Sequence, residues 1–177
     1  MQQLIMRWVN DGAPFEEIIL PDGFSIKTLN ELENGIEIWL DIIKHGLTDT
    51  RKSEEYYNAN MLSYKNYTPD KCFFILYGGK AIATITVICD DIKKEGYIHM
   101  VACHEDFRGR GIGTLLNKLA MKILKTEEMQ TAYLTTDDWR IPAIKSYFRA
   151  GFYADESTDD FKMRWASIRE KIKNGES

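Results

Sequence analysis

The sequence has few cysteines, no long apolar run and no block of basic residues, and each absence excludes a class of protein. Its three cysteines are odd in number and form no C-x-x-C pair, which disfavours a disulfide framework and a zinc site. No apolar run approaches the length of a membrane span, and Met1–Asn10 lacks the layout of a signal peptide. A formal net charge of -4, without a Lys/Arg cluster, disfavours nucleic acid. We therefore expect a cytoplasmic protein without a membrane, nucleic-acid or metal partner.

The most informative stretch of the sequence is a strand, a glycine turn and a helix in succession. Residues 97–103 alternate and are rich in β formers, and Gly109, Gly111 and Gly113 come next. An apolar stripe of helical spacing then begins with Ile112, Leu115, Leu116, Leu119 and Ile123. A helix start presents backbone N–H groups without intrahelical partners, and glycines let an anion approach them closely. The stretch therefore predicts a phosphate-binding turn.

The spacing of the glycines excludes two common phosphate-binding motifs. The nucleoside-triphosphate loop needs a Lys and a Ser or Thr after its last glycine, but Ile112, Gly113 and Thr114 follow Gly111. The dinucleotide fingerprint needs two residues between its second and third glycines, and here there is one. The remaining pattern, R-G-R-G-I-G after a strand, resembles the acetyl-coenzyme A loop of the Gcn5-related N-acetyltransferases. The alternative is a structural turn without a ligand.

A second motif lies downstream at a distance that suits the same family. The segment A-I-K-S-Y-F-R-A-G-F, residues 143–152, is similar to the family pattern A-x-x-x-Y-x-x-x-G-F. Ala143 and Tyr147 are four residues apart and share a helix face, and the resemblance implies that this face meets the coenzyme, with the Tyr hydroxyl near its sulfur. A phenol is a suitable general acid for a leaving thiolate. Tyr147 is therefore the predicted catalytic acid, and the alternative is an amphipathic Tyr at the edge of the core.

The resemblance also implies which residues bind the coenzyme. Backbone N–H groups of the turn would hold the pyrophosphate, and the preceding strand end would pair with the pantetheine amides through main-chain atoms. These residues are Val101, Ala102, Cys103, Arg108, Gly109, Arg110, Gly111, Ile112, Gly113 and Thr114. The Asn that many family members have three residues before Ala143 is replaced by Arg140. Asp137 and Asp138 are the nearest polar alternatives for a contact with the coenzyme or the acceptor.

The general base and the acceptor wall are less sharply defined. The family's base tends to lie on the strand before the glycine turn, where Tyr97, His99, Val101 and Cys103 are expected to alternate onto one face. His99 is the candidate base because of its ordinary pKa, and the alternative is a core His bonded to backbone. In the family the acceptor wall corresponds to residues 44–64. Acidic and aromatic side chains suited to an amine occur there: Asp49, Glu54, Glu55, Tyr56 and Tyr57.

The order of the predicted elements agrees with the fold of this family. Strands are expected over residues 3–9, 24–29, 72–77, 80–89, 97–103 and 131–136, and a final hairpin over 152–155 and 161–165. Helices are expected after residues 32 and 53, over 112–125 and 142–150, and at 166–173. This predicts one domain, residues 1–177, of the α+β class in three layers. Its central sheet is mixed and mostly antiparallel with flanking helices, the acyl-CoA N-acyltransferase fold. The resemblance is strongest over 97–152.

These patterns predict an enzyme, an acetyl-coenzyme A dependent N-acetyltransferase. It would pass the acetyl group directly to a primary amine of an unidentified small molecule or peptide, without a metal. Two alternatives stay open: an acyltransferase with another acyl donor or a non-amine acceptor, and a non-catalytic acyl-CoA-binding regulatory module. Sheet-mediated dimers are frequent in the family, so a homodimer is a further expectation.

Overall fold

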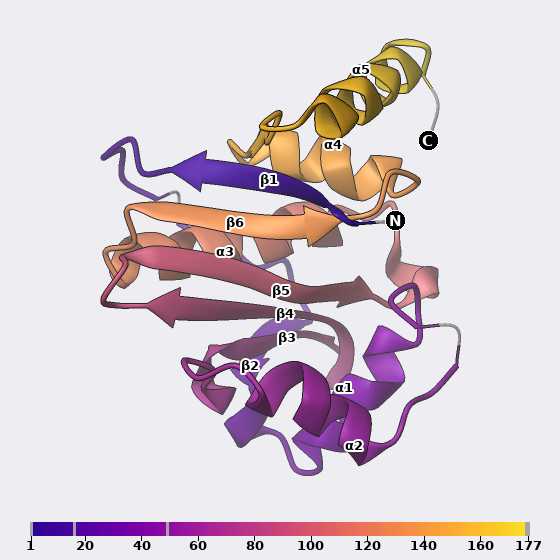
Figure 1. Cartoon of the computed structure of the whole chain (residues 1–177). Coiled ribbons are helices and arrows are strands. Elements are labelled where there is room, and N and C mark those ends of the chain that lie inside the picture. Colours follow the sequence, from indigo (N-terminus) through magenta and orange to yellow (C-terminus); the bar gives the residue numbers. More distant parts are fainter. Residues whose placement is uncertain (1, 16, 49, 176–177) are drawn as a thin grey trace.

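The computed structural model describes residues 2–15, 17–48 and 50–175, so Asp49 of the expected acceptor wall lies outside the described residues. Seven strands form one sheet in the order β2-β3-β4-β5-β6-β1-β7 (Figure 1). Only the β5–β6 pair is parallel among the strand pairs of the described residues. The predicted mixed, mostly antiparallel sheet is therefore confirmed. The strands are β1 Leu4–Val9, β2 Phe24–Thr28, β3 Cys72–Tyr77, β4 Lys80–Asp90, β5 Glu95–Cys103, β6 Thr131–Thr136 and β7 Tyr153–Ala154.

Helices cover both faces of the sheet (Figure 1). One core lies between β3–β4 and the first helices, and the other lies between the strands β1, β4, β5 and β6 and the last three helices. In the described part of the chain, no helix is long and apolar enough to cross a membrane. The helices are α1 Gly35–Ile43, α2 Glu54–Tyr57, α3 Ile112–Thr126, α4 Ile141–Arg149 and α5 Asp159–Lys173, and a π-helical turn, η2 Asn58–Leu62, extends α2.

The two parallel strands at the centre of the sheet separate part-way along their length. β5 and β6 pair only over Glu95–Ile98 and Thr131–Leu134. β5 nevertheless continues to pair with β4 as far as Cys103. Over residues 99–103, the edge of β5 that faces β6 therefore has no strand partner among the described residues. Backbone N–H and C=O groups along such an edge are able to pair with an extended ligand.

A β-bulge lies in β5 at the point of this separation. Thr84 pairs with Ala102 and Thr86 pairs with His99, so β5 contains one residue more than β4 between these pairs. Met100 takes up the extra residue with a φ of 52°, a left-handed conformation that is unusual for a non-glycine residue. Bulges and positive φ values of this kind are concentrated next to functional sites.

The bulge overturns the expectation that four alternating residues of β5 share one face. His99 is bonded to Asn60 of η2, on the α1–α2 side of the sheet. Val101 and Cys103 instead pack against the core on the α3 side. The extra residue shifts the alternation by one, so side chains after the bulge lie on the face opposite to the one that a regular strand would give them. Tyr97 and His99 therefore stay together, but without Val101 and Cys103.

The predicted C-terminal hairpin is also wrong. β7 is present, but residues 161–165 belong to α5, and β7 pairs with the N-terminal strand β1. The backbone N–H of Phe161 donates to Thr158 Oγ1 at 3.1 Å, which makes Thr158 the N-cap of α5. Two aspartates follow in the first turn, where negative charge favours a helix. The Thr-Asp-Asp run was therefore a helix-start signal, which the apolar alternation of the following residues obscured.

Candidate active site

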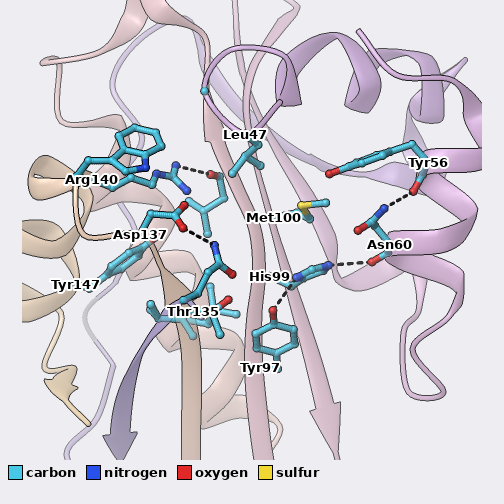
Figure 2. Close-up of a pocket in the computed structure, with 16 residues that line it drawn as sticks. Leu47, Tyr56, Asn60, Tyr97, His99, Met100, Thr135, Asp137, Arg140 and Tyr147 are labelled. Carbon is cyan, nitrogen blue, oxygen red and sulfur yellow. Dashed lines mark hydrogen bonds between the residues drawn. The ribbon is translucent and has the colours of Figure 1, made fainter. Parts of the chain in front are cut away.

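A cavity of about 230 Å³ lies where β5 and β6 separate. β5 forms its floor, the loop between β6 and α4 forms one wall with α4, and the loop after α1 forms the other wall with α2 and η2 (Figure 2). The side chains that carry polar groups into it include Tyr56, Asn60, His99, Asp137, Arg140 and Tyr147. Of the acidic and aromatic side chains expected in the acceptor wall, Tyr56 is the one among the described residues that lines this cavity, together with Gly46, Leu47 and Asn60 of the same stretch.

The glycine turn before α3 has the form of an anion-binding site. Gly109 and Gly111 have φ values of 73° and 78°, which glycine adopts without strain. No described atom lies within 4 Å of the position that a Cβ would take at either residue, so the turn is open. The N-cap of α3 is Gly111, which has no side chain to bond the first N–H groups, so these groups and the positive end of the helix dipole are directed at the turn. These features fit a pyrophosphate.

The two arginines of this turn are directed to neighbouring protein groups. Arg108 donates through Nη2 to the carbonyl of His45 and through Nε to the carbonyl of Cys103 at 3.4 Å. The Arg110 guanidinium lies 5.3 Å from the centroid of the Phe107 ring. Arg108 thus ties the loop after α1 to the glycine turn. An anion at this turn would therefore be held by main-chain atoms.

Of the strand-end residues predicted to bind the coenzyme, Val101 is among those that line the cavity, and Ala102 and Cys103 are not. The Val101 carbonyl accepts a long hydrogen bond of 3.5 Å from Arg140 Nη2. Ala102 is buried. The Cys103 thiol donates to the carbonyl of His104 at 3.5 Å, and burial raises the pKa of this thiol. A raised pKa disfavours the thiolate, so Cys103 has the properties of a structural residue.

α4 places Tyr147 in the wall of the cavity (Figure 2). The side chain is only 5% exposed, and its ring packs edge-on against Phe152 with 6.3 Å between the centroids. Burial raises the pKa of the phenol, and the positive charge of Arg140 partly opposes this rise. The hydroxyl is therefore protonated at neutral pH and able to give up a proton only to a strong base.

His99, on the β5 floor next to η2, has both ring nitrogens bonded (Figure 2). Nε2 lies 2.8 Å from the carbonyl oxygen of Asn60, and Nδ1 lies 3.0 Å from the hydroxyl of Tyr97. A carbonyl oxygen only accepts, so Nε2 carries the proton and the lone pair of Nδ1 accepts from Tyr97 O–H. Asn60 lies in the last turn of its helix, where carbonyls lack intrahelical partners. The helix end thus fixes the tautomer of the imidazole.

Burial shifts the pKa values of this pair in opposite directions. It lowers the pKa of His99 and raises the pKa of Tyr97 to about 12. Both groups are therefore neutral at pH 7, with the imidazole as the more basic member. The Tyr97 ring is held against Tyr133, with 4.6 Å between the centroids and 12° between the planes. A proton is able to pass between the Tyr97 hydroxyl oxygen and His99 Nδ1, because the two atoms already share a hydrogen bond.

The three polar candidates between β6 and α4 have different surroundings. Asp137 lines the cavity and accepts a hydrogen bond of 3.1 Å from Gln3 Nε2. Asp138 is instead bonded to Arg164 of α5, which lowers the pKa of its carboxyl group. Arg140 lines the cavity next to Val101. Asp137 and Arg140 thus remain candidates for a ligand contact, and Asp138 has a structural partner.

Other expected acceptor residues lie outside the cavity. Tyr57 is buried, and its hydroxyl lies 2.8 Å from that of Tyr67, so it belongs to the core. Glu54 and Glu55 are exposed in the first turn of α2. Within the described residues, no group of three or more His, Cys, Asp or Glu side chains has an arrangement that would hold a metal ion.

Sequence reasoning missed three features of the cavity. The Tyr97 hydroxyl was detectable, because a Tyr and a His two residues apart on a strand lie on one face. The carbonyl of Asn60 depends on a π-helical turn that no sequence pattern indicated. Trp139, in the loop after β6, lines the cavity although that loop has no recognisable motif.

Comparisons with known proteins identify similar chains. Residues 36–152 match the model of the acetyltransferase (GNAT) family. N-alpha-acetyltransferase 30 of Xenopus laevis is 31% identical over 111 residues, which cover 60% of this chain and 41% of that protein. The chain therefore spans about two fifths of the length of that relative.

Two solved structures share the fold at low sequence identity. A GCN5-related N-acetyltransferase from Sphaerobacter thermophilus has a TM-score of 0.67 at 17% identity, over 88% of this chain and 50% of that one. Arabidopsis thaliana Naa50, in complex with the bisubstrate analogue CoA-Ac-MVNAL, has a TM-score of 0.56 at 21% identity, over 76% of this chain and 85% of that one. At these identities the likeness concerns the fold.

A substitution at the glycine turn tests whether its backbone is an anion site. Gly111→Ala forces a side chain onto a residue with a φ of 78°, which tilts the N–H groups at the start of α3. Losing one charge-assisted hydrogen bond would weaken acetyl-coenzyme A binding by about tenfold or more, measured by calorimetry. Gly79→Ala is the matched control, because Gly79 has a φ of 81° and equally open surroundings at the tip of the β3–β4 hairpin. Equal affinity in the two variants would contradict the assignment.

Proposed function

Since the chain belongs to the GNAT acetyltransferase family, we propose that it transfers the acetyl group of acetyl-coenzyme A to a primary amine. The observation that carries this proposal is the cavity between β5 and β6, which lies beside an open anion site and between two hydroxyl-bearing walls. We also propose that residues 1–177 form one acetyltransferase domain, because all seven strands lie in one sheet.

The residues present fit the coenzyme. Backbone N–H groups over Gly109–Thr114 would hold the pyrophosphate, and main-chain groups of residues 99–103 would pair with the pantetheine amides as an added strand. The bound coenzyme would supply an activated acetyl thioester and would leave as a thiolate. The chain itself has to orient the acceptor amine, remove a proton from it and provide a proton for the thiolate.

We assign the acid role to Tyr147. Its phenol is protonated at neutral pH because burial raises the pKa, and it lines the cavity from the wall opposite His99. A phenol gives its proton readily to a group that is more basic, which a thiolate becomes when it is desolvated. The nearby charge of Arg140 favours the phenolate that remains, and so assists the transfer.

We assign the base role to Tyr97 and His99 acting together. Tyr97 O–H already donates to Nδ1 of His99, so the hydroxyl oxygen is able to accept the proton of the amine while its own proton moves to Nδ1. The resulting imidazolium donates through Nε2–H to the carbonyl of Asn60, which stabilises its charge. His99 alone, as predicted from the sequence, would reach the amine only through Tyr97 or a water molecule.

The acceptor class that we favour is the α-amino group of a peptide N-terminus. The Xenopus relative is an N-alpha-acetyltransferase by name, and the Arabidopsis structure carries a coenzyme–peptide analogue. Support from this chain is the aromatic and polar lining of the cavity, with Tyr56, Tyr97 and Asp137. Such groups suit an amine that arrives as an ammonium ion and loses its proton on binding.

A thiol-release assay tests the proposed function. Acetyl-coenzyme A would be presented with pentapeptides that have free α-amines, with the same peptides blocked at the N-terminus but containing a lysine, and with spermidine. We expect release of coenzyme thiol, and acetylated product by mass spectrometry, with the free α-amines. Release with spermidine or the lysine peptides alone would contradict the acceptor class. Binding of acetyl-coenzyme A without release would identify a binding module, and absence of binding would refute the function.

The acid role predicts a selective kinetic defect. Tyr147→Phe should lower kcat by about 100-fold, the usual contribution of a positioned acid, because the phenol proton is lost while the ring packing against Phe152 remains. The dissociation constant for acetyl-coenzyme A should stay unchanged by calorimetry. Tyr153→Phe, at an exposed position on β7, is the control and should leave both quantities unaltered. A normal kcat in Tyr147→Phe would clear this residue of the acid role.

The base role predicts the pH dependence of kcat/KM. The pKa of His99 lies below its ordinary value of 6.5, so the neutral form predominates at pH 7 and is lost as the pH falls below 6.5. We expect an acidic limb in that range. His99→Gln should lower kcat/KM by about 100-fold and abolish the limb, and Tyr97→Phe should give a similar loss. His45→Gln and His104→Gln, the other two histidines, should keep the limb. A limb that survives in His99→Gln would assign the titration to another group.

A further inference from the structure

Trp139 is unlike the other tryptophans of the chain. Trp8, Trp39 and Trp165 are at most 5% exposed, whereas Trp139 is 69% exposed and lines the cavity. Its indole lies 5.8 Å from the guanidinium carbon of Arg140. A large exposed ring at the edge of a cavity is a typical contact for a binding partner, because burying it on binding contributes strongly to affinity.

The loop that carries Trp139 is held from one side by α5. Arg164 donates to both carboxylate oxygens of Asp138, with a distance of 2.9 Å from Nε to Oδ2. The same guanidinium donates through Nη1 to Asp160 and to the carbonyl of Gln2, each at 3.0 Å. The Arg164 side chain is 11% exposed, and those of Asp138 and Asp160 are 36% and 60% exposed, so solvent screens the bonds to Asp138 less than the bond to Asp160. A two-pronged bond of this kind fixes both the position and the orientation of the loop.

The N-terminus holds the same loop from a second side. Gln3, just before β1, donates through Nε2 to Asp137 at 3.1 Å, and the carbonyl of Gln2 accepts from Arg164. Residues 2–3 and α5 both lie outside the range 36–152 that matches the family model. The segments that flank the family core therefore fix the loop of residues 137–140 beside the cavity. A rigid loop presents its contact without an ordering cost on binding.

We propose that the loop of residues 137–140 is a docking platform for the acceptor, with Trp139 as its contact and Arg164 as the positioning residue that holds it. The proposal rests on the proposed function, because its ligand is the acceptor peptide of that reaction. The indole face packs on the first side chains of a peptide whose α-amine has entered the cavity. Apolar first residues bury the indole best, so the platform favours acceptors that begin with bulky apolar side chains.

Fluorescence of Trp139 tests the platform without turnover. The probe is coenzyme A joined through an acetyl bridge to the α-amine of the pentapeptide Met-Leu-Ala-Ala-Gly, compared with coenzyme A alone and with the pentaglycine conjugate. Because the other tryptophans are buried, acrylamide quenching reports mainly on Trp139. We expect the Met-Leu conjugate to protect Trp139 from acrylamide, pentaglycine to protect it less, and coenzyme A alone to leave it quenchable.

Matched variants separate the platform from a general structural effect. Trp139→Ala should weaken binding of the Met-Leu conjugate by about tenfold while the affinity for coenzyme A stays unchanged. Arg164→Met should abolish the protection of Trp139 and cause a similar loss. Arg169→Met, on the same helix as Arg164, removes only the exposed ion pair with Glu156. It should change neither the binding of the conjugate nor the protection of Trp139. Asp138→Asn is a milder change to the bond between Arg164 and Asp138, and it should lose part of the protection of Trp139.

Two outcomes have distinct meanings. If coenzyme A and its conjugates all fail to bind the wild-type chain, the proposed function itself is refuted. Suppose instead that coenzyme A and its conjugates bind, that Trp139 stays quenchable in the complex, and that Trp139→Ala binds the Met-Leu conjugate with wild-type affinity. The platform is then refuted and the proposed function stands.

Discussion

β5 and β6 lie side by side for only four residue pairs, and the early loss of their pairing is the constraint on which the site depends. An unpaired strand edge inside a protein leaves N–H and C=O groups that need partners. Here a bulge at Met100 re-aims the backbone, and Arg140 bonds the carbonyl of Val101. The remaining groups face a cavity, where an extended ligand with amides of its own would complete the sheet. The open edge is therefore a structural liability, and in the proposed function it is also the surface that binds the coenzyme.

The cavity between the separated strands also brings together two groups, Tyr147 and His99, whose pKa values are shifted in opposite directions by burial. Tyr147, on the α4 side, is kept protonated, and His99, on the η2 side, is kept neutral. The same physical cause acts on both, because a low-dielectric environment disfavours the charged form of either group. In the proposed mechanism, Tyr147 gives its phenol proton, and the Tyr97 hydroxyl accepts the proton of the amine while its own proton moves to His99 Nδ1. Two neutral sites are enough for such proton transfers in opposite directions.

The parts of the molecule that the sequence allowed us to predict are those with a local physical signal. The glycine turn, the A-x-x-x-Y helix face and the alternation of most strands depend on neighbouring residues, and the sheet and its order of elements follow from them. The bulge at Met100 and the helix after Thr158 were missed. In the first case a non-glycine residue adopts a positive φ that no local pattern signals, and in the second an apolar alternation outweighed a good N-cap. The positions of Asn60 and Arg164 relative to the cavity arise from long-range packing, which no local pattern encodes.

Amide hydrogen exchange with and without coenzyme A measures the use of the open edge most directly. The account predicts that the coenzyme slows exchange at the backbone amides of β5 within residues 99–103 that face β6, and at Gly109–Thr114 of the turn. The paired residues Glu95–Ile98 would be unaffected, because their amides already belong to the sheet or its interior. Binding of the coenzyme with no change in exchange at residues 99–103 or 109–114 would place it elsewhere and contradict the account.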